Sequence, residues 1–242
     1  MTSSDRGRSC GGALVEMVVA LTLGLVVLGC VGSAAIATLR SGRDLVRRVD
    51  SLELVRTVWV VLDEELASGR HGRDWRLDES GFLKLRAFRG IARVCGFASA
   101  DSGFDVVYRG RRSPVPGRDS VLVLGTDARW RAFALDGSSS AGGCEGGETR
   151  EVSRWDWEQP SSAPPPVLAR LFERGSYHLV DGALRYRRGD GGRQPLTQER
   201  LLPESGFVGA DEGVLVRLHL RGGRDSGHPF PFVWMVRGQD AW

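Results

Sequence analysis

Residues 12–38 read GALVEMVVALTLGLVVLGCVGSAAIAT, an apolar stretch with a single charged residue, Glu16. At a helical rise of about 1.5 Å per residue, a stretch of this length can cross the hydrocarbon core of a bilayer as one helix. Asp5, Arg6 and Arg8 precede it with a slight positive excess, which favours a cytoplasmic N-terminus. The sequence therefore predicts a single-pass membrane protein whose larger, C-terminal part lies outside the cytoplasm.

Two kinds of signal peptide would also begin with such a stretch. Ala35-Ile36-Ala37 offers a site for a general signal peptidase, which would release a soluble mature protein. Gly29-Cys30 offers the cysteine of a lipoprotein signal, although Val27 and Leu28 suit the positions before it poorly. Neither signal accounts for Glu16, because a charge at the membrane centre costs about 2.5–3.5 kcal/mol on insertion scales, and less near the edge. A plain membrane anchor with an incidental glutamate is a third alternative.

Gly11 followed by GALVEMVVAL resembles the class III signal of type IV prepilins and type II secretion pseudopilins. In that family a prepilin peptidase cuts after a glycine, and a glutamate occupies the fifth mature position. The resemblance implies that residues 1–11 are a leader peptide, that cleavage separates Gly11 from Gly12, and that Gly12 becomes an N-methylated first residue. The family usually has an aromatic first residue, and Gly12 departs from that pattern. The resemblance also implies an inner-membrane subunit with a C-terminal domain that is periplasmic or lies in an extracellular filament.

Glu16 then has a physical role in joining subunits. Cleavage after Gly11 exposes an amino group on Gly12, and an ordinary pKa of about 8 leaves such a group mostly charged. A cation and a carboxylate are each costly in lipid and cost much less as a pair. We therefore expect Glu16 of one subunit to pair with the terminus of the next and to set the assembly register. The expected partners are prepilin peptidase, other pilins or pseudopilins contacted through the N-terminal helix, and the inner membrane.

An amphipathic stripe continues the helical pattern through residues 39–68. Apolar residues recur there at spacings of three and four, which predicts a helical half that packs on the domain through this face. Residues 58–62 are apolar all round, so we expect them to be deeply buried. Ser68-Gly69 is the expected end of the helix. The stripe comprises Leu45, Val49, Leu52, Val55, Trp59, Leu62 and Leu66.

Residues 69–242 show the short alternating apolar runs of β-strands, separated by glycine, proline and charged turns. Asp181-Gly182 lies between two such runs, SYHLV and ALRYRR, and is the strongest hairpin signal. The sequence thus predicts an α+β fold, with a transmembrane helix half (12–38) and an amphipathic half (39–68) packed on an antiparallel β-sheet. The resemblance implies the same pilin-like architecture. The strand candidates are 82–88, 104–108, 121–124, 130–135, 177–180, 183–187, 214–220 and 230–236.

Two segments of this region read as exposed loops. Residues 137–147 are rich in Ser and Gly, and residues 159–166 contain a proline cluster. Trp155 and Trp157 lie between them at alternate positions. We expect one strand face to bury both tryptophans; a contact patch for a partner or ligand is the alternative.

The cysteines divide by compartment. Cys10 leaves with the leader and Cys30 lies within the membrane helix, so Cys95 and Cys144 remain in an oxidising compartment. We expect a disulfide between them, worth about 4 kcal/mol in the chain-entropy model for a loop of about fifty residues. Two buried free thiols are the alternative, because the sequence does not show that the two residues are close.

The sequence contains no recognisable catalytic motif. Its four histidines, His71, His178, His219 and His228, lack metal-ligand spacing, and there is no G-x-S-x-G, phosphate-binding loop or H-E-x-x-H. Carboxylates at 189–192 and 210–213 fit no complete calcium loop, and we interpret both segments as turns. The net charge of +3 comes from arginines interleaved with acidic residues, which predicts no nucleic-acid partner. We expect a protein without enzyme activity, cofactor or metal.

Two C-terminal stretches resemble the domain of the PilW/PulJ-like minor group. These are DSVLVLG and GSYHLVDGALRYRRGDGGRQPLTQERLLPESGF. This resemblance is diffuse and implies a minor pilin or pseudopilin that acts in assembly initiation or at the filament tip. A secreted binding domain released after Ala37 and an enzyme tethered by the helix are the alternatives.

Overall fold

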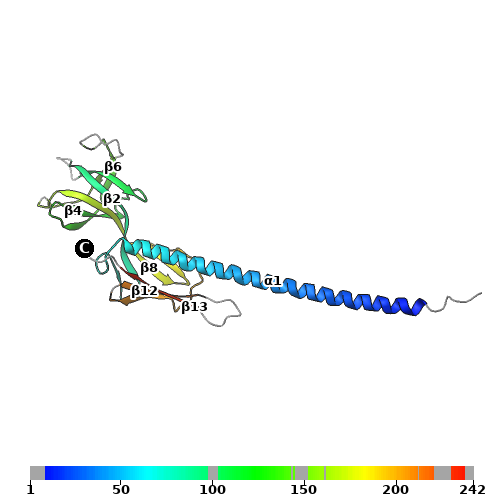
Figure 1. Cartoon of the computed structure of the whole chain (residues 1–242). Helices are drawn as coiled ribbons and strands as arrows, with labels where there is room; N and C mark the ends of the chain where they lie inside the picture. Colours follow the sequence, from blue (N-terminus) through cyan, green and yellow to red (C-terminus); the bar gives the residue numbers. More distant parts are fainter. Residues whose placement is uncertain are drawn as a thin grey trace, which may run out of the picture. The chain divides into compact units, whose positions relative to one another are not determined.

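The computed structural model describes residues 9–97, 103–142, 144, 152–160, 162–211, 213–220 and 230–237, with the backbone alone at 9–12, 97 and 230. The chain divides into two compact units, the first ending at Glu53 and the second beginning at Leu54. The elements are α1 (Ser9–Ala67), β1 (Trp75–Leu77), β2 (Leu83–Phe97), β3 (Gly103–Gly110), β4 (Asp119–Gly125), β5 (Trp130–Ala134), β6 (Gly137–Ala141), β7 (Val152–Asp156), β8 (Pro166–Val180), β9 (Ala183–Arg188), β10 (Arg193–Pro195), β11 (Gly206–Ala210), β12 (Gly213–Leu220) and β13 (Phe230–Arg237) (Figure 1).

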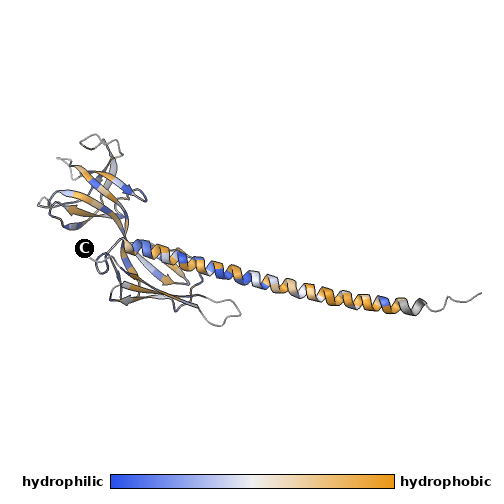
Figure 2. Ribbon diagram, viewed as in Figure 1, coloured by the Kyte–Doolittle hydropathy of each residue, from blue (hydrophilic) through white to orange (hydrophobic). Residues whose placement is uncertain are grey.

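Helix α1 is continuous and strongly apolar in its N-terminal half (Figure 2). The large apolar side chains from Leu14 to Leu39 are 49–73% exposed. The helix is long and apolar enough to cross a membrane, by length and composition. A helix that is apolar all round has no polar face to turn toward water, so this segment requires lipid or other helices around it.

The C-terminal end of α1 is capped by side chains from the sheet domain. The indole Nε1 of Trp75 donates to the carbonyls of Leu66, at 3.1 Å, and Gly69, at 3.3 Å. Arg170 donates from Nη2 to the Ser68 carbonyl at 2.8 Å, while its guanidinium lies 3.5 Å from the ring centroid of Phe88. These donors satisfy carbonyls that the end of a helix leaves without intrahelical partners. The predicted helix end near Ser68-Gly69 is confirmed.

Two 15-residue strands, β2 and β8, form the spine of the large antiparallel sheet. They pair from Leu83 opposite Tyr177 to Arg93 opposite Leu168, with an irregularity between Phe88 and Gly90. The neighbours change along this spine. At one end it pairs with β1 and β9, and β9 with β10; we call this the proximal part of the sheet. At the other end β8 pairs with β4 and β2 with β3, and we call this the distal part.

The distal part is a curled sheet in the order β5-β4-β8-β2-β3-β7-β6. Its two edge strands are consecutive in the chain, and only Leu135 and Asp136 separate β5 from β6. Trp155 and Trp157 are buried in its core, so the predicted burial of both tryptophans is confirmed. The core comprises Ala92, Val106, Val121, Val123, Leu135, Trp155, Trp157, Ala169 and Leu171.

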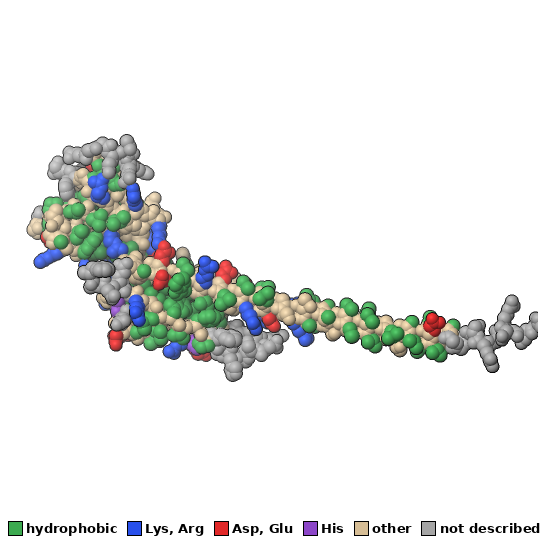
Figure 3. All heavy atoms as spheres, in the orientation of Figure 1, with side chains coloured by type: hydrophobic (Ala, Val, Ile, Leu, Met, Phe, Trp, Pro, Cys, Tyr) green, Lys and Arg blue, Asp and Glu red, His purple; other side chains and the backbone are tan. Residues whose placement is uncertain are grey.

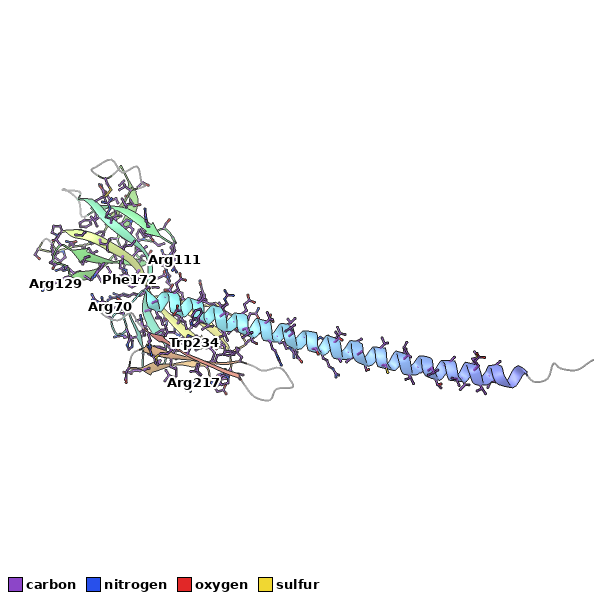
Figure 4. The ribbon with its side chains drawn as sticks, viewed as in Figure 1. Arg70, Arg111, Arg129, Phe172, Arg217 and Trp234 are labelled. Carbon is purple, nitrogen blue, oxygen red and sulfur yellow. A yellow bond between two sulfur atoms is a disulfide. The ribbon has the colours of Figure 1, made fainter. Side chains whose placement is uncertain are left out.

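The proximal part and a separate three-stranded sheet, β11-β12-β13, share a core with the last four turns of α1. Trp234 of β13, labelled in Figure 4, also packs against this core. The predicted α+β class, with a helix on antiparallel sheet, is therefore confirmed. The buried members from the helix are Leu54, Val58, Leu62 and Leu66, and those from the sheets are Trp75, Leu83, Leu85, Ala87, Tyr177, Leu184, Phe207, Val214, Val216, Leu218, Leu220 and Val236, with Leu201 from a connecting segment.

The prediction of which face of α1 packs on the domain is partly wrong. Leu62 and Leu66 are buried, but Leu52 and Trp59 are 58% and 48% exposed, and Leu45 and Val49 are exposed as well. The buried residues repeat at every fourth position, whereas the predicted stripe advances by 3.5 residues on average and winds round a straight helix. Residues 58–62 are consequently not buried all round: Val58 and Leu62 are, while Trp59 and Val60 face outward.

Each of the eight strand candidates coincides with a strand of the structure, except that Phe82 and Leu135, at the ends of two candidates, lie just outside β2 and β5. The Asp181-Gly182 hairpin is confirmed, because Val180 pairs with Ala183 and the two turn residues have φ of 52° and 74°, as a type I′ turn requires. The exposed loop predicted for 137–147 is wrong at its start, where residues 137–141 form β6. Its serines carry no apolar alternation, and only backbone pairing with β7 makes it a strand.

Candidate functional site

Glu16 is isolated on the exposed apolar part of α1. It is itself exposed, as are the neighbouring Leu14, Val15, Met17 and Val18. Residues 13–39 contain no Lys, Arg or His, so no basic side chain of this segment can neutralise it. Surrounded by lipid, the carboxylate would need a cation supplied from outside the segment.

The next charged residue along α1 is Arg40, 24 positions after Glu16. At about 1.5 Å per residue the two lie about 36 Å apart along the helix axis, somewhat more than the hydrocarbon thickness of a bilayer. Figure 3 shows apolar side chains covering this segment on the face in view. The geometry places Glu16 near one edge of a spanning segment, where a carboxylate costs less than at the centre.

The predicted cleavage site lies at the start of this helix. Gly11 and Gly12 have helical backbone within α1, which begins at Ser9. Residues 1–8 of the predicted leader and the side chain of Cys10 lie outside the described residues. Cleavage between Gly11 and Gly12 and methylation of Gly12 stay predictions.

A buried ionic cluster attaches the end of α1 to the sheet domain. Arg89 of β2 donates from Nη1 to Glu65 Oε1 at 2.6 Å, and from Nη2 to Glu173 Oε1 of β8 at 2.8 Å. Tyr186 donates to the same Glu173 oxygen at 3.0 Å. Arg89, Glu65 and Glu173 are each at most 12% exposed at the side chain. One guanidinium therefore joins the last helical turn to both long strands.

The cluster continues through Arg112 to the start of β4. Arg112 forms two hydrogen bonds to Asp119, at 2.6 and 2.7 Å, and one to Glu173 Oε2 at 2.9 Å. Arg188 pairs with both Asp119 and Glu173. Three guanidiniums thus meet three carboxylates, which neutralises the charge where burial makes an unpaired ion costly.

The arginines keep the two sheet carboxylates ionised. Burial by itself raises the pKa of Glu173, but hydrogen bonds from Arg89 and Tyr186 and the nearby positive charges lower the pKa below its usual value. At Asp119, burial likewise raises the pKa, but hydrogen bonds from Arg112 and from the Val115 backbone N–H lower it below its usual value. The chemistry of the cluster is pairing of charge, and its role is to hold the elements together. Its members are too far apart in the sequence for any spacing motif to reveal them.

An exposed apolar surface remains on the part of α1 that belongs to the second unit. Trp59 is 48% exposed and Val60 42% exposed. At 3.6 residues per turn Val60 lies on the side of the helix away from Val58 and Leu62, and Trp59 lies at the edge of the buried face. Glu64 lies beside this surface and pairs with Arg111, whose position Figure 4 shows. Trp59 and Val60 are both apolar side chains that the described part of the sheet domain leaves exposed.

The predicted disulfide is present in the structure. Cys95 of β2 bonds Cys144, with the two Cα atoms 5.5 Å apart, so the prediction is confirmed. Cys30 is a free thiol, exposed on α1. The disulfide ties the segment beyond β6 back to the spine of the distal part.

The histidines lie apart from one another among the described residues. His178 is buried on β8, where its Nε2 lies 2.7 Å from Ser176 Oγ, and His219 lies on β12. The ring of His71 packs at a tilt against that of Trp75, with centroids 4.6 Å apart, and His228 lies outside the described residues. Within the described ranges, no group of three or more potential metal ligands comes together.

Comparisons with known proteins gave no match: no protein-family model, no curated protein and no solved structure matches this chain.

Proposed function

We propose that this chain is a minor pilin or pseudopilin, a structural subunit of a type IV pilus or type II secretion filament that acts in assembly initiation or at the tip. In this proposal prepilin peptidase cuts between Gly11 and Gly12, and the chain resides in the inner membrane with its sheet domain in the periplasm. The observation that carries the proposal is Glu16, a single carboxylate in an exposed apolar segment without any basic side chain.

A membrane anchor has no use for such a carboxylate, whereas an assembling helix does. The terminal amine created at Gly12 supplies the missing cation, and pairing in lipid is strongly favoured over two separate ions. An amine from a neighbouring subunit fixes the axial position at which the two helices meet. The charge pair therefore converts non-directional contact between apolar helices into a defined register.

The attachment of the domain to α1 suits a subunit that is moved by its helix. Glu65 and Arg89 join the last helical turn to β2, and the buried row from Leu54 to Leu66 packs against both sheets. The exposed Trp59 and Val60 then provide apolar area for contact with a neighbouring subunit. Within the proposal, one helix carries both the membrane segment and the docking surface of the domain.

The test compares Glu16→Gln with Asp44→Asn, which removes a carboxylate from the same helix outside the apolar stretch. Both variants should insert, and mass spectrometry should find a mature chain that begins at Gly12. Only Glu16→Gln should lose incorporation into filaments or cross-linking to other pilin subunits. Normal incorporation of Glu16→Gln into filaments would contradict the pairing mechanism. A natural mature chain that begins at Thr38 would instead identify a released, secreted domain.

A further inference from the structure

Basic side chains cover the outer face of the proximal part of the sheet. Residues alternate along each strand between the two faces of a sheet, and directly opposed residues on neighbouring strands share a face. Leu83, Tyr177 and Leu184 belong to the core shared with α1, so the residues next to them in their strands point to the other, outer face. No carboxylate occupies an outward strand position there. The outward basic residues, which we call the basic face, are Arg76, Lys84, Arg86, Arg174, Arg185, Arg187 and Arg193.

Cations lie directly opposite cations on this face. Like charges in directly opposed positions destabilise a sheet. The fold itself gains nothing from such an arrangement, whereas an anion bound over the face would relieve the repulsion. The opposed pairs are Arg76 with Lys84, Arg86 with Arg174, and Arg187 with Arg193.

Some of these charges are balanced by acidic residues from the surrounding turns, and some are not. Arg76, Arg174 and Arg193 are exposed, and none of them forms an ion pair with a described residue. Strands β8, β9 and β10 and the turns between them are described in full. Three guanidiniums of the basic face thus have no anionic partner within the described chain. The acidic residues that pair with the others are Asp78 with Lys84, Asp74 with Arg86, Asp181 and Glu199 with Arg185, and Asp190 with Arg187.

The size of the basic face indicates the shape of its ligand. Neighbouring strands are about 4.8 Å apart, so the row that crosses the strands from Arg76 to Arg193 is about 19 Å long. The outward residues of β8 from Arg174 to His178 extend over about 14 Å. The resulting area of about 270 Å² is well below the roughly 800 Å² that each partner buries in a stable protein interface. A narrow, elongated anion therefore fits this face better than a globular protein.

The composition of the face favours a saccharide over a nucleic acid. Proteins that bind single strands stack the bases on exposed aromatic rings, but the ring of Phe82 on this face lies beneath Arg193, whose guanidinium is 5.3 Å from the ring centroid. Duplex DNA carries one negative charge per about 1.7 Å, and the exposed carboxylates of Asp181, Asp190 and Glu199 would repel so dense a charge. The same carboxylates can accept hydrogen bonds from sugar hydroxyls.

We propose that the basic face binds a linear acidic polysaccharide, a polyuronate, that lies across strands β1, β2, β8, β9 and β10. Arg76, Arg174 and Arg193 pair with its carboxylates, because a guanidinium and a carboxylate form two parallel hydrogen bonds. The acidic residues in the turns accept hydrogen bonds from its hydroxyls. The surface is separate from the membrane segment of α1, and its role goes beyond that of a filament subunit.

Calorimetry of the full chain in micelles of an uncharged detergent, with hexagalacturonate as the probe, tests this proposal. We expect saturable binding, and binding of the neutral maltohexaose weaker by about tenfold or more, because the charge-assisted hydrogen bonds are lost. Arg174→Gln/Arg193→Gln should weaken hexagalacturonate binding by a similar factor. Its melting temperature should equal or exceed that of the natural chain, because one member is removed from each of two like-charge pairs.

Arg129→Gln/Arg217→Gln is the matched control. It removes the same charge from two exposed arginines outside the basic face, both labelled in Figure 4, and should leave hexagalacturonate binding unchanged.

Four outcomes would overturn the proposal. These are no saturable binding of hexagalacturonate, equal affinity of Arg174→Gln/Arg193→Gln and the natural chain, an equal loss in the control variant, and a short DNA duplex binding as tightly as hexagalacturonate. Because calorimetry needs no filament, a failure here leaves the proposed filament role intact. A failure of the Glu16 experiment likewise leaves the proposal for the basic face standing.

Discussion

Arg89 Nη1 lies 2.6 Å from Glu65 Oε1, and this ion pair joins the last turn of α1 to the spine of the sheet. The side chains are only 12% and 10% exposed, so water does little to screen the pair. The same guanidinium also holds Glu173. A single guanidinium therefore bridges two buried carboxylates from elements far apart in the sequence.

Replacement of Arg89 by Gln should destabilise the sheet domain strongly. The change leaves Glu65 without its partner and weakens the pairing of Glu173, and breaking a buried ion pair from one side typically costs about 3–5 kcal/mol. Urea unfolding of the full chain in detergent, followed by near-ultraviolet circular dichroism, measures the loss of unfolding free energy.

Arg111→Gln is the matched control. Arg111 pairs with Glu64, the neighbour of Glu65, but both side chains are more than half exposed. An exposed pair contributes about 0–1 kcal/mol, so this variant should be nearly as stable as the natural chain. Equal losses of unfolding free energy in the two variants would show that burial does not increase the contribution of the Arg89 pair to stability.

Acid should destabilise the domain through Glu173 and Asp119. Despite burial, the arginines lower the pKa of both carboxyl groups in the folded state. In acid the unfolded chain therefore binds more protons than the folded one, and the stabilisation that is present above about pH 4.5 is lost as the pH falls through the folded pKa values. The unfolding free energy should be similar at pH 7 and pH 5 and lower at pH 3. Stability that holds or rises down to pH 3 would contradict this assignment.

The parts of the fold that could be predicted carry local signals. The apolar run sets Glu16 apart, the Asp181-Gly182 turn fixes its hairpin through two residues with positive φ, and compartment arguments select Cys95 and Cys144 from four cysteines. Each of these inferences needs only neighbouring residues or a short count.

What the sequence could not predict depends on long-range placement. The buried face of α1 is chosen by the sheets that it meets, which is why Trp59 lies outside and Val58 inside. The ionic cluster joins Glu65 to Arg89 and Arg112 to Glu173, pairs 24 and 61 positions apart. Strand β6 depends on backbone pairing with β7, which no local pattern of the sequence reveals.

Gly182→Ala should weaken the β8–β9 hairpin. Gly182 has φ of +74°, and an added Cβ would lie 3.3 Å from the Leu201 carbonyl oxygen. A non-glycine residue in the left-handed region costs about 1–2 kcal/mol, so the unfolding free energy should fall by that amount. Gly192→Ala is the control, because its backbone is not left-handed and open space surrounds it. A melting temperature equal to that of the control would show that the turn tolerates a side chain.

Removal of the disulfide should destabilise the domain without changing its membrane insertion. Cys95 and Cys144 are 49 positions apart, and a bond that closes a loop of this size contributes about 4 kcal/mol in the chain-entropy model. The double variant Cys95→Ser/Cys144→Ser should therefore unfold at a lower urea concentration than the natural chain, and a reductant should shift only the natural chain. Cys30→Ser, at the free thiol on α1, should leave the midpoint unchanged. Equal midpoints for the natural chain and the double variant would mean that the strands of the distal part hold this segment without the covalent bond.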